Sequence, residues 1–151
     1  MSEPDKARRE MAAEFGADFT VDPLNEPVPD FIKERTGGRG CEAVFYTAGG
    51  APAINQGIDS LVYNGTLVVY GATGKQDSLE LDPKLFHYNE IYLTGVTKHT
   101  KDGFRRAAGL ISAGDERFKK LISAVYPFRD AEAAFRRSIQ MDTYRVILAM
   151  Q

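Results

Sequence analysis

Apolar residues recur along the chain in blocks that alternate between helical and extended spacing. At helical spacing they predict helices at roughly 4–15, from Val28 to a stop at Gly37, at 51–63, near 82–88, from Phe104 to a stop at Gly114, and over 131–139. Short unbroken apolar runs predict strands at 19–21, 43–47, 66–70, 91–95 and 144–148. Gly16 is placed to end the first helix, Asn64-Gly65 to end the third, and Asp130 to cap the last.

The strand over 66–70 shows the packing most clearly. Its residues, Thr66-Leu-Val-Val-Tyr70, include three β-branched side chains and do not alternate with polar ones. Such a strand is typical of a parallel sheet that is covered on both faces. With helices between the strands, the pattern predicts an α/β fold with right-handed crossovers, built as a single domain over residues 1–151.

Composition narrows the class of protein. The chain has 151 residues, a formal net charge of −2, 43% hydrophobic residues and 26% charged residues, which are ordinary globular values. The near-neutral balance argues against nucleic acid as a partner, and no apolar run reaches the ~20 residues of a membrane span. The opening residues lack the apolar core of a signal peptide, so we expect a soluble, cytoplasmic protein.

Few residues are spaced for nucleophilic or metal chemistry. His87 and His99 lie twelve positions apart, without the spacing of a metal site, and we expect partly exposed side chains. The single cysteine, Cys41, excludes an intrachain disulfide and is expected to be a small core residue. No GxSxG elbow, GxxxxGK[ST] loop or Tyr-x-x-x-Lys pair occurs.

One glycine pattern matches the residue pattern of a phosphate-binding loop but lies between the wrong secondary-structure elements. Gly38-Arg-Gly40-Cys-Glu-Ala43 matches GxGxxA. The phosphate-binding version follows a strand and opens a helix, whereas this loop follows a helix and opens a strand. We therefore interpret these glycines as a helix stop and a tight turn.

Two other loops are better placed for a ligand. Thr47-Ala-Gly-Gly50 and Gly71-Ala-Thr-Gly74 directly follow predicted parallel strands. Ligands of open α/β sheets bind beyond the carboxyl ends of strands, and side chains this small let a flat ligand approach the main chain. The alternative is that both are ordinary turns between a strand and a helix.

Glu3 is a second kind of candidate. An acidic residue before the first helix can accept both hydroxyl hydrogens of a ribose and repel a 2′-phosphate, which favours NAD over NADP. The alternative is that Ser2-x-x-Asp5 is a capping box and Glu3 a favourable charge in the first turn.

The order of these motifs resembles the zinc-type medium-chain alcohol dehydrogenase family, with sorbitol and threonine dehydrogenases as the most similar branch. The resemblance rests on many modest motifs over nearly the whole chain. In the first half of the chain these are Glu3-Pro-Asp-Lys-Ala-Arg8-Arg, Met11-Ala-Ala-Glu-Phe-Gly-Ala-Asp18, Val21-Asp-Pro, Gly38-Arg-Gly40-Cys-Glu-Ala-Val-Phe and Asn64-Gly65-Thr-Leu-Val-Val-Tyr-Gly71. In the second half they are Gly95, Ser112-Ala-Gly114, and the C-terminal segment that runs from Phe128 through Ala134-Phe135 to Tyr144-Arg145-Val-Ile-Leu.

The resemblance implies that residues of this chain at positions matching the family's motifs contact a bound NAD. Glu3 would bind the adenosine ribose, with Arg8 beside the adenine or ribose, and Arg145 would meet the pyrophosphate. The remaining positions would surround the nicotinamide and its ribose: Thr47, Ala48, Gly49, Tyr70, Gly71, Ala72, Val96 and Thr97.

The chain also departs from the family pattern. It lacks the lobe with the zinc ligands and proton relay, so we expect no zinc and no catalytic residue in this chain alone. It lacks the first strand, the GxGxxG loop and nearly all of the second strand. The expected fold is therefore an incomplete Rossmann-type, three-layer parallel sheet without its first two strands, which exposes two strand edges.

Three explanations remain open: a fragment of a longer product, a half completed by a partner chain, or a rearranged sheet. We expect a homo-oligomer or a missing N-terminal portion as the partner, because the apolar strand Leu67–Tyr70 would aggregate if uncovered. The predicted function is a part of an NAD(P)-dependent alcohol or polyol oxidoreductase. The alternatives are a non-catalytic oligomerisation module, with pairing through the strand at 91–95, and a flavodoxin-type nucleotide-binding domain.

Overall fold

The computed structural model describes residues 1–74, 76, 78–79 and 81–150. The chain divides into two compact units, Met1–Lys98 and His99–Gln151. The expectation of one domain over residues 1–151 stays a prediction.

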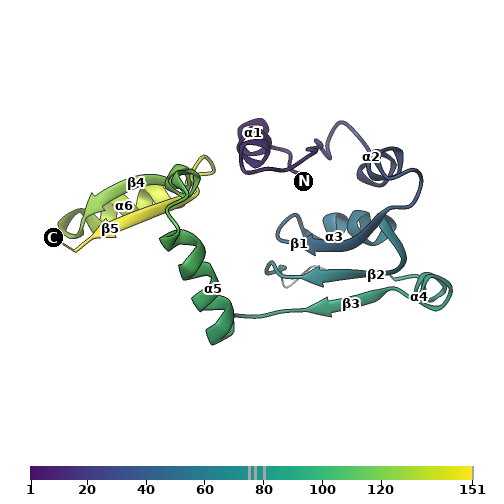
Figure 1. The fold of residues 1–151 in the computed structure, drawn as a ribbon. Helices are drawn as coiled ribbons and strands as arrows, with labels where there is room; N and C mark the ends of the chain where they lie inside the picture. Colours follow the sequence, from purple (N-terminus) through teal and green to yellow (C-terminus); the bar gives the residue numbers. More distant parts are fainter. Residues whose placement is uncertain (75, 77, 80, 151) are drawn as a thin grey trace. The chain divides into compact units, whose positions relative to one another are not determined.

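The first unit is built around a parallel sheet of three strands in the order β1-β2-β3 (Figure 1). A separate parallel bridge joins Ser2 to Val21 near the start of the chain. The elements of this unit are α1 (Lys6–Glu14), α2 (Val28–Arg35), β1 (Cys41–Tyr46), α3 (Gly50–Asp59), β2 (Leu61–Val69), α4 (Pro83–Asn89) and β3 (Tyr92–Gly95).

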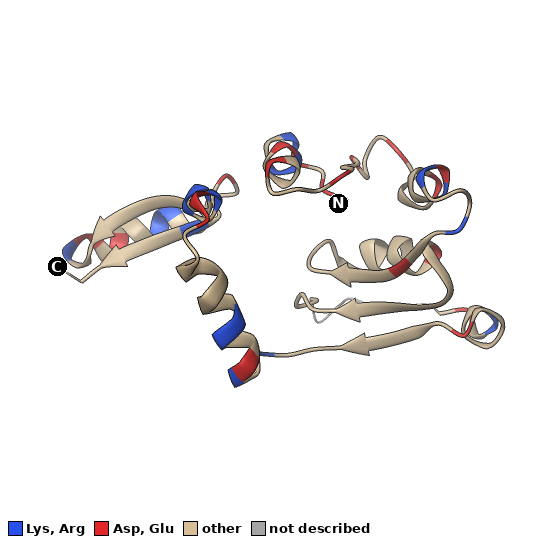
Figure 2. Cartoon of the chain, viewed as in Figure 1, with Lys and Arg blue, Asp and Glu red and all other residues tan. Residues whose placement is uncertain are grey.

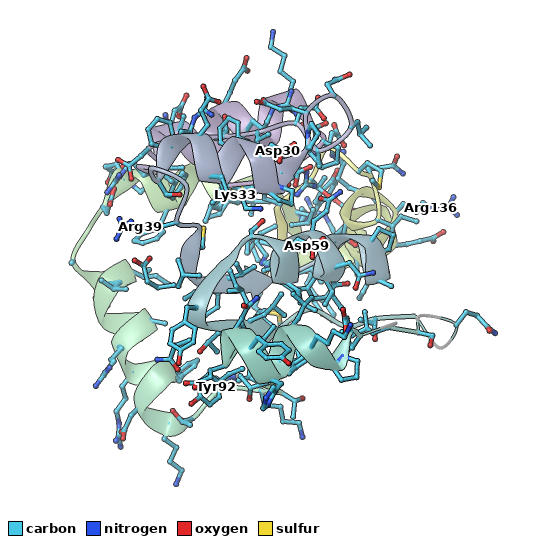
Figure 3. All side chains as sticks on the ribbon, turned by 90° about the vertical axis from the view of Figure 1, so that its right-hand side faces the viewer. Asp30, Lys33, Arg39, Asp59, Tyr92 and Arg136 are labelled. Carbon is cyan, nitrogen blue, oxygen red and sulfur yellow. The ribbon has the colours of Figure 1, made fainter. Side chains whose placement is uncertain are left out.

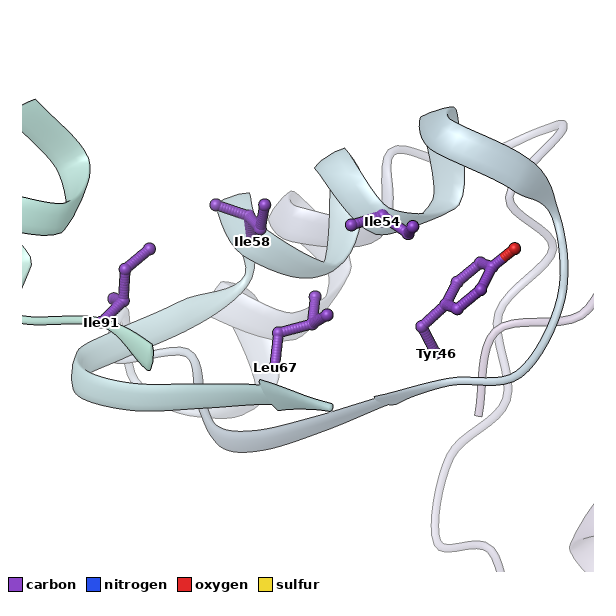
Figure 4. Close-up of a cluster of buried hydrophobic side chains, with 5 residues drawn as sticks. All are labelled: Tyr46, Ile54, Ile58, Leu67 and Ile91. Atoms are coloured by element: carbon purple, nitrogen blue, oxygen red, sulfur yellow. The ribbon is translucent and has the colours of Figure 1, made fainter. Parts of the chain in front are cut away.

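The main core lies between one face of this sheet and α3 (Figure 4). Leu67 in β2 is 0% exposed and Ile54 in α3 is 2% exposed. The register pairs Val44 with Leu67, and Tyr46 with Val69, so these alternate positions share the covered face. The large apolar side chains here come from elements that face each other and exclude water. The burial of this apolar surface is the main contribution to the stability of the unit.

The opposite face of the sheet is open within this unit. Phe45 is 69% exposed and Tyr92, labelled in Figure 3, is 59% exposed. Val68, which pairs with Phe45, is half-buried. The expectation that the strand at 66–70 is covered on both faces is therefore wrong for this unit by itself.

A second, smaller apolar cluster lies in the same unit. It joins Val21 to Val28 and Phe31 of α2. The Arg35 guanidinium stacks 3.5 Å from the centre of the Phe31 ring. This cluster ties the start of α2 to the segment that carries the Ser2–Val21 bridge.

The second unit contains a parallel pair of strands with a helix packed on both. β4 (Ile122–Pro127) pairs with β5 (Arg145–Ala149), and α6 (Ala131–Ser138) contacts each strand. Also in this unit are α5 (Lys101–Ser112) and the short 3-10 turns η1 (Glu116–Leu121) and η2 (Phe128–Asp130). Gly114 follows α5 with φ +80°, as expected for a glycine that ends a helix.

Most predicted elements are confirmed, and several boundaries and caps are corrected. Helix α3 ends at Asp59 instead of residue 63, and Asn64-Gly65 lies within β2 instead of ending a helix. The strand at 19–21 is reduced to one bridge at Val21. Strand β4 was not predicted. The first helix is capped by Asp5, whose carboxylate accepts from the Arg8 N–H at 2.9 Å, and Asp130 makes no capping bond through its side chain.

Charged residues lie mostly on the helices and loops (Figure 2). The three strands of the first unit carry one charged residue, Glu42. Among the described residues, no helix has the length and apolar character needed to cross a membrane.

Candidate functional site

The carboxyl ends of the three strands lie level with one another. The register places Tyr46 beside Val69, and Val69 beside Gly95. Because the strands are parallel, the segments that follow them meet at one edge of the sheet. That edge is formed by residues 47–49, 70–72 and 96–97, eight of the positions for which the sequence predicts a cofactor role.

Two of these segments are held against each other through the main chain. The Tyr46 carbonyl accepts hydrogen bonds from the N–H groups of Tyr70 and Gly71, each at 2.9 Å. A Cβ atom added at Gly71 would lie 2.0 Å from the Thr47 carbonyl oxygen. Gly71 therefore has a structural reason to be glycine that is independent of any ligand.

The loop after β1 is anchored by a buried tyrosine. Tyr46 is 4% exposed, and its phenol oxygen accepts a hydrogen bond from the Gly50 N–H at 3.0 Å. Gly49, at the N-cap of α3, has φ +109°, a conformation that side chains rarely adopt. Sequence reasoning missed Tyr46, although a tyrosine at the end of a buried strand before a glycine pair is the signal that could have found it.

The side chains at this edge are small or exposed. Thr47, Ala48 and Ala72 are all exposed. Tyr70 is 65% exposed and Val96 is 47% exposed. The edge thus offers main-chain groups and short side chains to a flat ligand, and it brings no charged side chain of its own.

Glu3 lies at the end of the N-terminal bridge. Its N–H donates to the Val21 carbonyl at 3.1 Å, and its carboxylate accepts from the Asp5 N–H at 2.9 Å. Its carbonyl accepts from Arg9, which forms an ion pair of 3.2 Å with Asp22. One carboxylate oxygen is thus engaged just before α1, which begins at Lys6 after the N-cap Asp5. The alternative interpretation, a Ser2-x-x-Asp5 capping box with Glu3 in the first turn, is therefore wrong.

A groove of about 690 Å³ runs between residues 1–3 and β1, and it is called the inter-strand groove below. Its lining includes Glu3, Thr47 and Ala48, so the structure brings these three predicted residues to one groove. The other predicted residues of the first unit, Arg8, Gly49, Tyr70, Gly71, Ala72, Val96 and Thr97, do not line it.

The two predicted arginines are placed differently. Arg8 is half-buried in α1, where its N–H donates to the capping Asp5. Arg145 belongs to the second unit, is exposed at the start of β5, and donates to the Tyr144 carbonyl at 2.9 Å. Their contact with a cofactor, like that of all eleven predicted residues, stays a prediction.

Cys41 is half-buried in the wall of the inter-strand groove, instead of lying in the core as predicted. Burial raises the pKa of its thiol, and the neighbouring Glu42 carboxylate raises it further, against a small opposing effect of the terminal ammonium. A raised pKa keeps the thiol protonated near neutral pH and makes it a poor nucleophile.

The remaining candidate motifs have structural roles. Gly38 has φ +81° and Gly40 has φ +106° between the end of α2 and the start of β1, which confirms the interpretation as a helix stop and tight turn. His87 and His99 are both exposed. Within the described part of the chain, no three His, Cys, Asp or Glu side chains are grouped so that they could hold a metal ion.

Comparison with known proteins places this geometry in context. Residues 1–113 match the family model described as zinc-binding dehydrogenase. The chain is 26% identical over 148 residues to an L-threonine 3-dehydrogenase from Caldanaerobacter subterraneus subsp. tengcongensis, an alignment that covers 97% of this chain and 42% of that protein.

Solved structures show the same fold. An alcohol dehydrogenase from Thermotoga maritima superposes with a TM-score of 0.89 at 22% identity, over 97% of this chain and 41% of that one. A protein from Sinorhizobium meliloti 1021, solved bound to NADP, has a TM-score of 0.86 at 24% identity, over 97% of this chain and 43% of its own. The chain therefore spans about two fifths of the length of these relatives and matches their C-terminal portion.

Proposed function

Because this chain belongs to the zinc-binding dehydrogenase family, we propose that its first unit supplies the nicotinamide and ribose side of an NAD(P) site in an alcohol or polyol oxidoreductase. The family binds NAD(P). In this proposal the chain contributes binding surface to the site, and it spans about two fifths of the length of its relatives.

The observation that carries the proposal is the level register of three parallel strand ends. Tyr46, Val69 and Gly95 end side by side, and Gly71 is pressed against the Thr47 carbonyl. This close packing holds both segments together at the edge of the sheet. Nucleotides of open α/β sheets bind at this kind of edge.

The residues of this edge suit a nicotinamide ring and its ribose. Thr47 is exposed, and its hydroxyl can donate to or accept from a ribose hydroxyl. Ala72 is exposed too, and its main-chain groups are of the kind that binds a carboxamide. The second carboxylate oxygen of Glu3 can accept from a ribose diol while the first stays bonded to the Asp5 N–H. When bound, the nicotinamide would supply hydride transfer.

Zinc does not fit the described residues, because they present no group of metal-ligating side chains. No step of the proposed role uses zinc.

Nucleotide titration tests the proposal. We expect the purified chain to bind NADH more tightly than NADPH in calorimetric titration, because the Glu3 carboxylate would accept from the 2′-hydroxyl and repel a 2′-phosphate. Hydrogen bonds to charged groups contribute about 1.5–3 kcal/mol, so Glu3→Gln should weaken NADH binding about tenfold and reduce the preference for NADH.

Glu10→Gln is the matched control, since it makes the same charge change on an exposed position of α1. It should leave both affinities unchanged. Equal weakening by the two variants would remove the specific role of Glu3. If neither nucleotide binds up to millimolar concentration, the proposal fails for this chain.

The second candidate is a non-catalytic interaction module. The open face of the first sheet favours it, since Phe45 and Tyr92 are largely exposed there. A chain that self-associates in sedimentation and binds neither nucleotide would support this candidate over the first.

A further inference from the structure

Glu3 is fixed through its main chain as well as through its side chain. Its N–H donates to the Val21 carbonyl at 3.1 Å, and its carboxylate oxygen Oε1 accepts from the Asp5 N–H at 2.9 Å. Its carbonyl accepts from Nη1 of Arg9 at 2.7 Å. The proposed function assigns the other carboxylate oxygen, Oε2, to a ribose diol.

The Arg9 guanidinium joins acceptors from two segments of the chain. Nη1 donates to the carbonyls of Glu3 and Pro4, each at 2.7 Å, and Nη2 forms the 3.2 Å ion pair with Oδ2 of Asp22. The Arg9 side chain is 18% exposed and that of Asp22 is 21% exposed, so salt screens this pair only partly. A planar guanidinium can hold three acceptors at once because its N–H groups have fixed directions.

Asp22 is itself held in place. Its Oδ1 accepts from the Leu24 N–H at 3.0 Å, and its Oδ2 accepts from Nδ2 of Asn25 at 3.0 Å. It directly follows Val21, which the N-terminal bridge joins to Ser2. Arg9 is therefore tied to an anchored residue, and through Arg9 so is the main chain of Glu3.

Helix α1 depends on these polar contacts for its position in the first unit. None of its residues is buried, so apolar burial within the unit does little to fix where the helix begins. The Arg9 N–H donates to the Asp5 carbonyl at 3.0 Å, which places Arg9 one turn into the helix. From there its side chain reaches back past the N-cap to the carbonyls of Glu3 and Pro4.

We propose that Arg9, held by Asp22, is a positioning residue that fixes the Glu3 carboxylate and thereby sets a preference for NAD over NADP. This inference rests on the proposed function, because it concerns the same ribose. A carboxylate distinguishes a 2′-hydroxyl from a 2′-phosphate only where it lies within hydrogen-bond distance of the ribose.

The ion pair has a second consequence for the same preference. An arginine near the ribose can accommodate a 2′-phosphate, which favours NADP. Asp22 and the two carbonyls engage the guanidinium of Arg9, so its charge is directed away from a nucleotide. Asp22 thus keeps Arg9 in a positioning role.

Arg9→Met tests the positioning role. We expect it to lower the ratio of NADH affinity to NADPH affinity about fivefold in calorimetric titration, because the Glu3 carboxylate loses its support. Charge alone predicts the opposite, since the loss of a cation weakens binding of the more highly charged NADPH. Lys6→Met is the matched control: it removes the same charge from an exposed ion pair of α1, Lys6–Glu10, and should not lower the ratio.

Asp22→Asn tests the second consequence. It keeps the size of the side chain but removes the negative charge that engages Arg9. The ratio should fall at least as far as in Arg9→Met, whereas Glu10→Gln, which removes a negative charge from an exposed position, should change it little. In the double variant, the Asp22→Asn change should have little further effect, because its partner is already absent.

Two features of the design separate positioning from stability. A smaller folded fraction weakens both nucleotides by the same factor, so it leaves the ratio unchanged. Amide exchange without nucleotide should accelerate at Glu3 and Asp5 in Arg9→Met and stay near wild type in β2. A wild-type ratio in both Arg9→Met and Asp22→Asn would overturn this inference alone. If the wild-type chain binds neither nucleotide, the proposed function fails, and this inference fails with it.

Discussion

At the scale of single residues, Gly71 shows how packing and candidate function overlap. The sequence marks Gly71 only as one of several small residues after a strand. The structure adds that Gly71 lies against the Thr47 carbonyl. A Cβ atom added to Gly71 would be 2.0 Å from the carbonyl oxygen of Thr47. Gly95, at the end of β3, has no such neighbour, since its nearest atom to an added Cβ is 3.9 Å away.

We expect Gly71→Ala to lower the free energy of unfolding by about 1–3 kcal/mol, because a rigid main-chain atom must move to admit the methyl group. Gly95→Ala is the control and should change it by less than about 0.5 kcal/mol. Urea unfolding followed by circular dichroism measures both. Equal stability of the two variants would contradict the close contact at Thr47.

At the scale of elements, pairing between strands overrides local periodicity. Residues 51–63 have helical spacing, yet the helix ends at Asp59 and β2 begins at Leu61. Leu61 pairs with Cys41, a partner twenty positions earlier in the chain. Asn64 adopts φ +61° inside this strand, so the residues expected to end a helix instead bend a strand.

The connection between α6 and β5 holds an ion pair whose contribution to the stability of the fold depends on pH. Arg137 donates two hydrogen bonds to the Asp142 carboxylate, one of them at 3.0 Å, and they hold the pKa of that carboxyl below its ordinary value of 3.8. A carboxyl whose pKa is lower in the folded state stabilises the fold above its unfolded value, and this contribution is lost as pH falls through the lowered pKa.

We therefore expect the wild-type second unit to lose stability as pH falls below about 3.8. Asp142→Asn should remove this part of the pH dependence, and Arg137→Gln should reduce it while keeping the carboxyl. Thermal unfolding at about pH 6 and about pH 3 measures the difference. A pH profile that Asp142→Asn leaves unchanged would argue against a stabilising role for this pair.

At the scale of the whole molecule, the chain consists of two compact units, and the family match ends at residue 113, inside the second. Each unit has its own parallel strands and its own packed helices. Units of this kind often open separately. The structure thus provides a way to test the prediction of a single domain.

We expect Leu67→Ala to destabilise the first unit by about 2–5 kcal/mol, because Leu67 is fully buried in its core. Amide exchange in β1 and β2 should accelerate accordingly, whereas exchange in β4 and β5 should stay near wild type. Leu24→Ala, at a 79% exposed position, is the control and should leave both units unchanged. Equal acceleration in β5 would show one cooperative domain.

The sequence by itself determined the α/β class, most helices and strands, and the family resemblance. It could do so because helical and extended periodicity, stop glycines and motif order are local properties. The predicted segments 47–49 and 70–72 were also found at strand ends, as their position after apolar runs indicated.

Tertiary structure alone decided the rest. The contact of Gly71 with Thr47 joins residues that are distant along the chain. The open face around Phe45 also depends on which elements pack on the sheet. Strand β4 escaped prediction, and its pairing with β5 joins segments about twenty residues apart. The inter-strand groove arises because Ser2 and Phe45 belong to two strand edges, and only the folded arrangement of the first unit brings those edges to the same groove.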